Sequence, residues 1–373
     1  MTRRVVVTGL GMVSPLGNDL ETSWQAALRG ESGVELVTSF DASILGSQIA
    51  GTVKNFDATK YLGVKEVRRF DRFVHFGVAA GIMALEDSKL EITDELSPEI
   101  GVAIGAGIGG IPVICANYDA LRERGPRRIS PFMIPGCIIN MVSGQLAIMK
   151  NLKGPNIAHV TACSTGLHAI GEAMHIIRRG DATVMIAGGA ESTIHPLAMG
   201  AFDAMHALSR RNDDPKTASR PFDTDRDGFV MGEGAGVLVL EELEHAKARG
   251  AKIYAEIAGY GLSGDASLLI AKAIIDGIAA VVFAASLGKG VFLSILPLGV
   301  YQGGLTLLAR FIRPWMTDEL IAQMSCVGSV LIFAVSLNMI RKDKIKVGNL
   351  LPAVFLPVVF YLLSRFFPVF ATL

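Results

Sequence analysis

Cys163 is the side chain in this sequence that is best placed to act as a nucleophile. It lies in the small-residue run Ala162-Cys163-Ser164-Thr165-Gly166, between an apolar stretch and a predicted helix. The helix prediction rests on apolar residues spaced at i, i+3, i+7 and i+10, namely Leu167, Ile170, Met174 and Ile177. At a helix N-terminus the dipole favours a thiolate, and backbone N–H groups can stabilise an oxyanion. A buried structural cysteine is the alternative, but the small neighbours favour the nucleophile.

No general base for this cysteine is evident nearby in the sequence. The nearest histidines are His159, on the preceding strand, and His168, on roughly the opposite face of the predicted helix. We interpret both as structural. The last histidine of the chain is His245. Cysteine nucleophiles in acyl transfer normally act with a base or with oxyanion donors, so the N-terminal part supplies a nucleophile without its usual partners.

The elements that must position Cys163 belong to a layered α/β domain over residues 1–266, because short β-branched runs alternate there with helical stretches. The predicted strands are Val5–Val7, Ile100–Ile104, Ile157–Thr161, Thr183–Ala187 and Gly236–Leu240. The predicted helices are Trp24–Leu28, Phe76–Leu90 and Leu167–Ile177. Cys163 then follows the carboxyl end of a buried strand, and Ser164 or Thr165 caps the helix that comes next.

Charge and cysteine content exclude several classes of protein. Residues 267–373 hold nine Lys and Arg against four Asp and Glu, and the chain as a whole is neutral, so residues 1–266 carry a net charge of −5. Neither part has a strong basic field, and we predict no nucleic-acid partner. The four cysteines are scattered, without the spacing of a disulfide framework or a metal site. The glycine runs lack the full dinucleotide-binding pattern, so we predict no cofactor.

The tail differs in kind from the rest of the chain. Its apolar runs are Ala273–Gly288, which carries Asp276 near its start, Gly290–Ala309, Leu320–Ile340 and Val347–Ser364, of which the last three are uncharged and 20, 21 and 18 residues long. Runs of this length are sufficient to cross a bilayer, so residues 267–373 are predicted to form an all-α transmembrane segment of three to four helices. A buried soluble core is the alternative. The first run could instead be re-entrant. The number of spans, and with it the side of the membrane on which residues 1–266 lie, is therefore not decided by the sequence.

A series of motifs occurs in a fixed order along the first 266 residues. The motifs are Val5–Pro15, Gly105–Gly110, Gly125–Phe132, Thr161–Gly166, Ala187–Glu191, Arg220–Asp223 and Asp227–Gly236. Together they resemble the β-ketoacyl-acyl-carrier-protein synthases of type II, and the resemblance continues to about residue 266. It implies the N-terminal half of a thiolase-type layered fold, here truncated, and a Claisen condensation in fatty-acid elongation that proceeds through an acyl-cysteine thioester.

The resemblance also implies roles for individual residues. Cys163 matches the acyl-accepting nucleophile, and Ile108 and Phe202 match positions that line the acyl pocket. A basic surface for the acidic acyl carrier protein is matched by Lys65, Arg68, Arg69, Arg127 and Arg128. The implied partners are an acyl carrier protein that delivers acyl and malonyl thioesters and a second copy of the chain in a homodimer. The synthase half is expected to be cytoplasmic, and the whole chain membrane-associated.

The chain departs from this family in its second half. The family uses two further histidines, a lysine and a Gly-Phe-Gly-Gly loop, and none of these motifs occurs after residue 266. Residues 267–373 contain the runs Lys272–Ile278, Tyr301–Gly304 and Lys346–Pro352, and through them resemble an uncharacterised bacterial multi-span membrane-protein family. We therefore expect Cys163 to accept acyl groups slowly and condensation to be absent or nearly so. The alternatives are a membrane protein with a dead synthase half, and a chimaera without a single evolved function.

Overall fold

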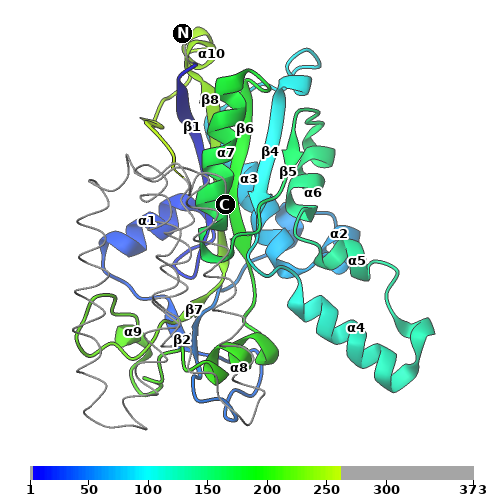
Figure 1. The fold of residues 1–373 in the computed structure, drawn as a ribbon, viewed down its shortest axis with the longest axis vertical. Helices are drawn as coiled ribbons and strands as arrows, with labels where there is room; N and C mark the ends of the chain where they lie inside the picture. Colours follow the sequence, from blue (N-terminus) through cyan, green and yellow to red (C-terminus); the bar gives the residue numbers. More distant parts are fainter. Residues whose placement is uncertain (1–2, 262–373) are drawn as a thin grey trace, which may run out of the picture. The chain divides into compact units, whose positions relative to one another are not determined.

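A six-stranded mixed sheet organises residues 3–261, the part of the chain that the computed structural model describes (Figure 1). The strands are β1 (Val5–Val13), β4 (Ile100–Gly105), β5 (Asn156–Ile157), β6 (Val184–Glu191), β8 (Gly234–Glu242) and β9 (Ala255–Glu256), in the order β5-β4-β6-β8-β1-β9. Strand β4 is parallel to β5 and β6, whereas the pairs β6–β8, β8–β1 and β1–β9 are antiparallel. The parallel pair β4–β6 matters for function because both strands end at the same edge of the sheet.

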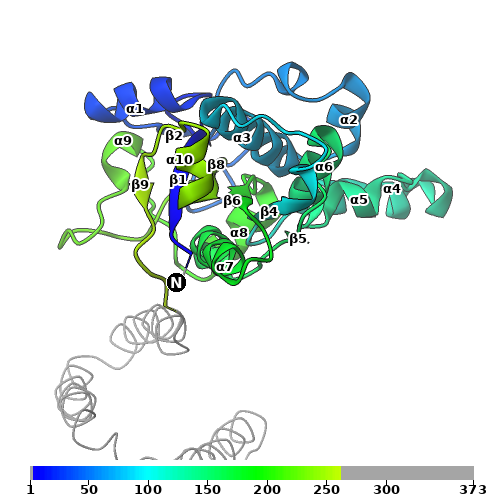
Figure 2. The ribbon, with the colours of Figure 1, turned by 90° about the horizontal axis from the view of Figure 1, so that it is seen from above.

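Helices cover both faces of this sheet, so the domain has three layers. Helices α3 (Arg72–Ser88) and α6 (Met141–Lys150) pack on one face, and α7 (Thr165–Arg179) packs on the other (Figure 2). Alternate residues of β6 point to opposite faces of the sheet. Ile186 belongs to the core beneath α3, whereas Met185 and Ala187 belong to the core beneath α7. The continuous apolar strands of the sequence therefore reflect burial on both faces.

Two glycines of β1 set how closely α3 approaches the sheet. A Cβ atom added at Gly9 would lie 2.2 Å from the carbonyl oxygen of Ala84, and one added at Gly11 would lie 1.9 Å from that of Ala80. Both distances are far shorter than a van der Waals contact, so a side chain at either position would push the helix away. Close helix packing therefore accounts for this Gly-Leu-Gly run.

Smaller elements surround the central layers. A three-stranded sheet contains β2 (Val34–Leu36), β3 (Ile49–Gly51) and β7 (Met231–Gly232). The remaining helices are α1 (Leu20–Leu28), α2 (Val64–Arg69), α4 (Ile111–Arg124), α5 (Met133–Cys137), α8 (Pro196–Ala204), α9 (Pro215–Ala218) and α10 (Leu243–Ala248). Helix α4 projects away from the sheet as an arm (Figure 1), and Ala120 is its one buried residue. The arm therefore gains little stability from contacts within its own domain.

The membrane-spanning segments predicted for the tail lie outside the described residues, as does the predicted boundary at residue 266. Within residues 3–261, no helix combines the length and the hydropathy needed to cross a bilayer.

Candidate active site

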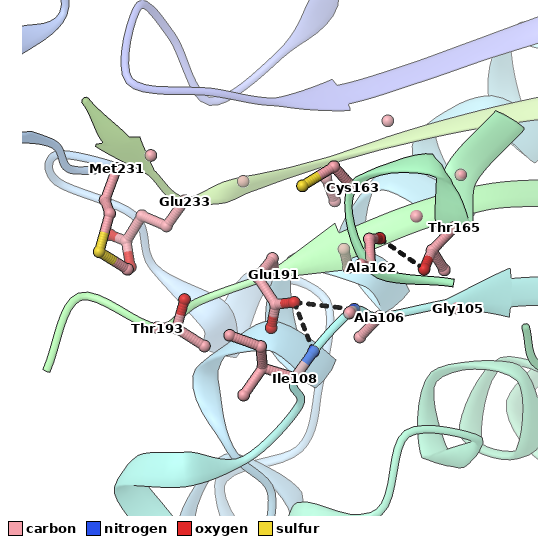
Figure 3. A pocket seen from close by; sticks show the side chains of 18 of the residues that line it. Gly105, Ala106, Ile108, Ala162, Cys163, Thr165, Glu191, Thr193, Met231 and Glu233 are labelled. Carbon is pink, nitrogen blue, oxygen red and sulfur yellow. Dashed lines mark hydrogen bonds between the residues drawn. The ribbon is translucent and has the colours of Figure 1, made fainter. Parts of the chain in front are cut away.

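A cavity of about 540 Å³ lies where β4 and β6 end (Figure 3). Its wall includes Cys163, Ile108 and Phe202, the three residues that the sequence indicated for the nucleophile and the acyl pocket. Other lining residues come from the ends of β4 and β6, from the start of α7 and from the segment around β7 and β8, among them Gly105, Thr165, Glu191, Thr193, Phe229, Met231 and Glu233. The fold therefore brings together residues that are far apart in the sequence, such as Gly105 and Glu233, which are separated by 128 positions.

Cys163 lies in a strained turn at the start of α7. Ala162 has a φ of +50°, a left-handed conformation that costs a residue with a side chain about 1–2 kcal/mol. Thr165 holds this turn, because its Oγ1 accepts a hydrogen bond from the Thr161 N–H at 2.9 Å and donates one to the Ala162 carbonyl at 2.7 Å. Ser164 Oγ donates to the Thr161 carbonyl at 2.8 Å. These bonds present the exposed Cys163 thiol on the cavity wall.

The local structure departs from the prediction in two details. The strand predicted over Ile157–Thr161 is paired only at Asn156–Ile157, because the chain must turn at Thr161 to present Cys163. Ser164 stands at the N-cap of α7 as predicted, but its hydroxyl does not bond a backbone N–H of the first turn. At its other end, α7 stops before Gly180, which takes the left-handed conformation with a φ of +86°.

No histidine lines this cavity within the part of the chain that the structure describes. Burial lowers the pKa of His159 and thus favours its neutral form, and its Nδ1 atom is buried without a hydrogen-bond partner in the described structure. The ring of His168 lies edge-on to that of Tyr260 at 6.1 Å. These environments agree with the interpretation of both histidines as structural.

Two carboxylates line the same cavity, and sequence reasoning assigned neither of them a role. Glu191, the last residue of β6, accepts hydrogen bonds from the backbone N–H groups of Gly107 and Ile108, both at 2.8 Å (Figure 3), and from that of Gly109 at 3.1 Å. Glu233 accepts one from the Ser192 hydroxyl at 2.6 Å and one from the Val53 N–H at 2.9 Å. The Gly-Gly-Ala-Glu motif draws attention to Glu191 in the sequence. The motif does not indicate that Glu191 binds the loop at Gly107–Gly109.

The five basic residues indicated for carrier docking form two groups. Lys65, Arg68 and Arg69 lie on α2, beside α5 and the start of α4, because the Asp71 N–H bonds the Gly136 carbonyl and the Gly110 N–H bonds the Cys137 carbonyl. Arg127 and Arg128 lie in a 3₁₀ turn after the far end of α4 (Figure 1). With 14 residues in α4, the two groups are separated by a helix roughly 21 Å long.

Comparison with protein families gives two matches along the chain. The model of the β-ketoacyl synthase N-terminal domain matches residues 2–246. A second model, described as a protein of unknown function (DUF554), matches residues 252–362. The first match contains every element of the cavity.

Individual relatives agree with the first match. The chain is 59% identical over 264 residues to the 3-oxoacyl-[acyl-carrier-protein] synthase 2 of Vibrio harveyi and 58% identical to that of Coxiella burnetii, and it spans 64% of the length of each. In both cases 71% of this chain is covered.

Solved structures of the family also share the fold. A β-ketoacyl synthase from Burkholderia phymatum superimposes with a TM-score of 0.63 at 35% identity, covering 69% of this chain and 64% of that one. A type II polyketide ketosynthase in complex with its acyl-carrier protein, AntDE:AntF, gives a TM-score of 0.60 at 33% identity, covering 69% of this chain and 62% of that one. Residues 2–246 form a thiolase-like α/β domain, and through this domain the chain belongs to the β-ketoacyl synthase family.

Proposed function

We propose that residues 1–266 act as the acyl-accepting part of a 3-oxoacyl-[acyl-carrier-protein] synthase of fatty-acid elongation. The observation that carries this proposal is the position of Cys163, on a strained turn in the wall of a cavity that also contains Ile108 and Phe202. The 59% identity to a synthase of this kind supports it. The Cys163 thiolate attacks the carbonyl carbon of an acyl thioester and forms a new carbon–sulfur bond. The bond between that carbon and the carrier sulfur breaks, and the carrier leaves as a thiolate that takes up the proton lost earlier from Cys163.

The cavity supports this reaction because its wall is mostly apolar. The Phe202 ring packs edge-on against the Phe229 ring, with the two centroids 5.5 Å apart. Ile108 lies across the cavity from Cys163 and is 39% exposed as a residue, so it remains available to contact a ligand. A volume of about 540 Å³ falls within the range of sites that hold small ligands. An acyl chain is a ligand of matching chemistry, since its methylene groups gain by leaving water.

The proposed partner is an acyl carrier protein that delivers acyl and malonyl thioesters. One structural relative is described as a ketosynthase in complex with its acyl-carrier protein. The two basic groups, on α2 and after α4, offer complementary charge to an acidic carrier, and such charge chiefly raises the association rate.

Charge reversal at the end of α4 tests this docking. In R127E/R128E we expect transfer from acyl-carrier protein to Cys163 to slow by on the order of tenfold at low salt, because two attractive contacts become repulsive. Transfer from acyl-pantetheine, which lacks the acidic protein, should keep the wild-type rate. Intact-mass spectrometry follows the acyl adduct in both cases.

The matched control is K247E/K252E, which reverses two charges near α10, at the opposite end of the main sheet from α4 (Figure 1). We expect this variant to accept acyl groups from the carrier at the wild-type rate. An equal loss in both variants would contradict specific docking. A wild-type chain that acquires no acyl adduct from any acyl thioester would overturn the proposed function itself.

A second copy of the chain is the partner that we propose for the arm. Exposed apolar side chains gather on α4 and on the return segment to α5, although α4 buries only Ala120 in its own domain. These side chains are Ile114, Tyr118, Leu121, Ile129, Phe132 and Ile134. A cluster of this kind favours a protein partner, which supports a homodimer through the synthase half.

The second proposal is a membrane protein that is attached through residues 267–373 and whose synthase half lacks condensing activity. It rests on the long uncharged runs of the sequence, and the DUF554 match covers most of them. We expect the chain to sediment with bacterial inner membranes and to be released by detergent but not by high salt. Recovery of the whole chain in the supernatant of a detergent-free, high-speed spin would contradict this proposal, and protease accessibility of residues 1–266 would report their side of the membrane.

A further inference from the structure

Glu191 contacts the cavity loop through three successive backbone N–H groups. Its Oε2 accepts from Gly107 and Ile108, and its Oε1 accepts from Gly109. This loop follows β4 and carries Ile108 on the cavity wall. Glu191 ends β6, which pairs with β4 in parallel, so the two carboxyl ends lie at the same edge of the sheet. One carboxylate therefore uses both of its oxygens to hold the segment that carries a pocket residue.

The geometry of the loop suits this bond pattern. Gly109 has a φ of +79°, which directs its N–H and the preceding ones into a common concavity that binds an anion. A Cβ atom at Gly107 would lie 3.1 Å from Glu191 Oε2, so a side chain there would crowd the carboxylate. Burial raises the pKa of Glu191, and the three N–H groups oppose that rise because they stabilise the charged form. Hydrogen bonds to a charged acceptor are among the stronger ones in proteins.

The neighbouring segments are anchored independently of Glu191. Ser192 donates to Glu233, and Glu233 also forms an ion pair with Arg72 at 3.3 Å. Downstream of the loop, the Val113 N–H donates to Asp71 at 3.3 Å. The loop is fixed upstream by the pairing of Gly105 with Gly189 and downstream by Val113, and between these points Glu191 holds the backbone around Ile108.

We infer that Glu191 is a positioning residue that holds Ile108 in the cavity wall and thereby sets which acyl chains reach Cys163. The inference rests on the proposed function, because it names a determinant of acyl-chain selection for the same site. A preformed apolar wall favours long chains, since no binding energy is spent on ordering the loop. Without the carboxylate, Gly107–Gly109 loses three charge-assisted hydrogen bonds and Ile108 loses its fixed position.

Maleimides of graded length test the inference without any acyl-transfer chemistry. The rates at which N-ethylmaleimide and N-dodecylmaleimide label Cys163 are measured by site-resolved mass spectrometry in the full-length chain. We expect the dodecyl-to-ethyl rate ratio to fall by on the order of tenfold in E191A. E191Q keeps one acceptor oxygen, so its ratio should be intermediate. The ratio cancels any general change in the reactivity of the thiol.

A double-mutant cycle assigns the effect to Ile108. In an I108A background, Glu191→Gln should no longer change the ratio, because the side chain that Glu191 positions is already gone. The matched control is D87N, which alters a carboxylate that accepts a backbone N–H from Leu10 away from the cavity, and its ratio should equal that of wild type. An unchanged ratio in both Glu191 variants overturns the inference, and equal effects in the wild-type and I108A backgrounds overturn the route through Ile108. Failure of carrier-dependent acylation would overturn only the proposed function.

Discussion

Alanine at position 163 is expected to abolish acyl transfer to this chain. Cys163 is the exposed cysteine in the cavity wall, whereas Cys115 and Cys137 are partly buried. Burial raises the pKa of both of the latter thiols, which keeps them protonated and poorly nucleophilic. A loss of at least a thousandfold is the order expected when the nucleophile of a covalent mechanism is removed.

The measurement is the acyl adduct on the intact chain after incubation with acyl-carrier protein. C137A is the matched control, since it removes a cysteine that does not line the cavity, and it should acquire the adduct at the wild-type rate. An adduct of wild-type size on C163A would mean that another group accepts the acyl chain. Peptide mapping would then identify that group.

The acylated chain is expected not to condense when malonyl-carrier protein is added. Condensation requires groups that decarboxylate malonate and stabilise the resulting negative charge. No imidazole lines the cavity among residues 3–261, and the sequence contains no histidine after His245. Detection of a 3-oxoacyl product at ordinary rates would show that a partner subunit or another part of the chain supplies these groups.

Much of the fold follows from local patterns in the sequence. The apolar spacing predicted a helix over residues 167–177, and α7 extends it by two residues at each end, to Thr165 and Arg179. Predicted strands begin within two residues of β1, β4, β6 and β8 because each of these carries a buried apolar run. Helix α4 was not predicted: it buries only Ala120, and its apolar residues Ile114, Tyr118 and Leu121 are exposed.

Some residues of the candidate site can be recognised from nearby sequence, whereas others depend on contacts between distant parts of the chain. Cys163 could be recognised because its small neighbours and the following helix are local. Glu191 could not be assigned, since its role depends on backbone N–H groups more than eighty residues away that only the β4–β6 pairing brings near. The strand before Cys163 was predicted too long, since only Asn156 and Ile157 pair with β4.

Replacing Arg249 with methionine is expected to destabilise the domain by about 3 kcal/mol, because it leaves a buried carboxylate without its main counter-charge. The Glu241 side chain is fully buried, and Arg249 bonds its two oxygens with Nε and Nη2, both at 2.7 Å. Arg249 also donates to the Ser88 carbonyl at 2.9 Å and so ties α10 to the end of α3. Thr8 and His245 remain as partners of Glu241, which keeps the loss near the lower end of the range for broken buried pairs.

This variant should also reverse the dependence of stability on pH. Burial alone would raise the pKa of Glu241, but the hydrogen bonds from Arg249 and Thr8 outweigh it and hold the pKa below the usual 4.5. In the wild type, the carboxylate therefore contributes stability that is present above about pH 4.5 and is lost as the pH falls through the lowered value. Without Arg249 burial dominates, the pKa rises above its ordinary value, and stability is lost as the pH increases through that range.

Urea unfolding followed by circular dichroism at pH 4 and pH 7 measures both effects. The deficit of R249M relative to wild type should be larger at pH 7 than at pH 4, since protonation removes the buried charge. The matched control is R29M, which breaks an ion pair with Glu31 in which both side chains are more than half exposed. Solvent screens that pair, so R29M should unfold at nearly the wild-type urea concentration at both pH values. A deficit in R249M that is equal at the two pH values would mean that Arg249 stabilises the domain through its contacts with α3 and not through the charge of Glu241.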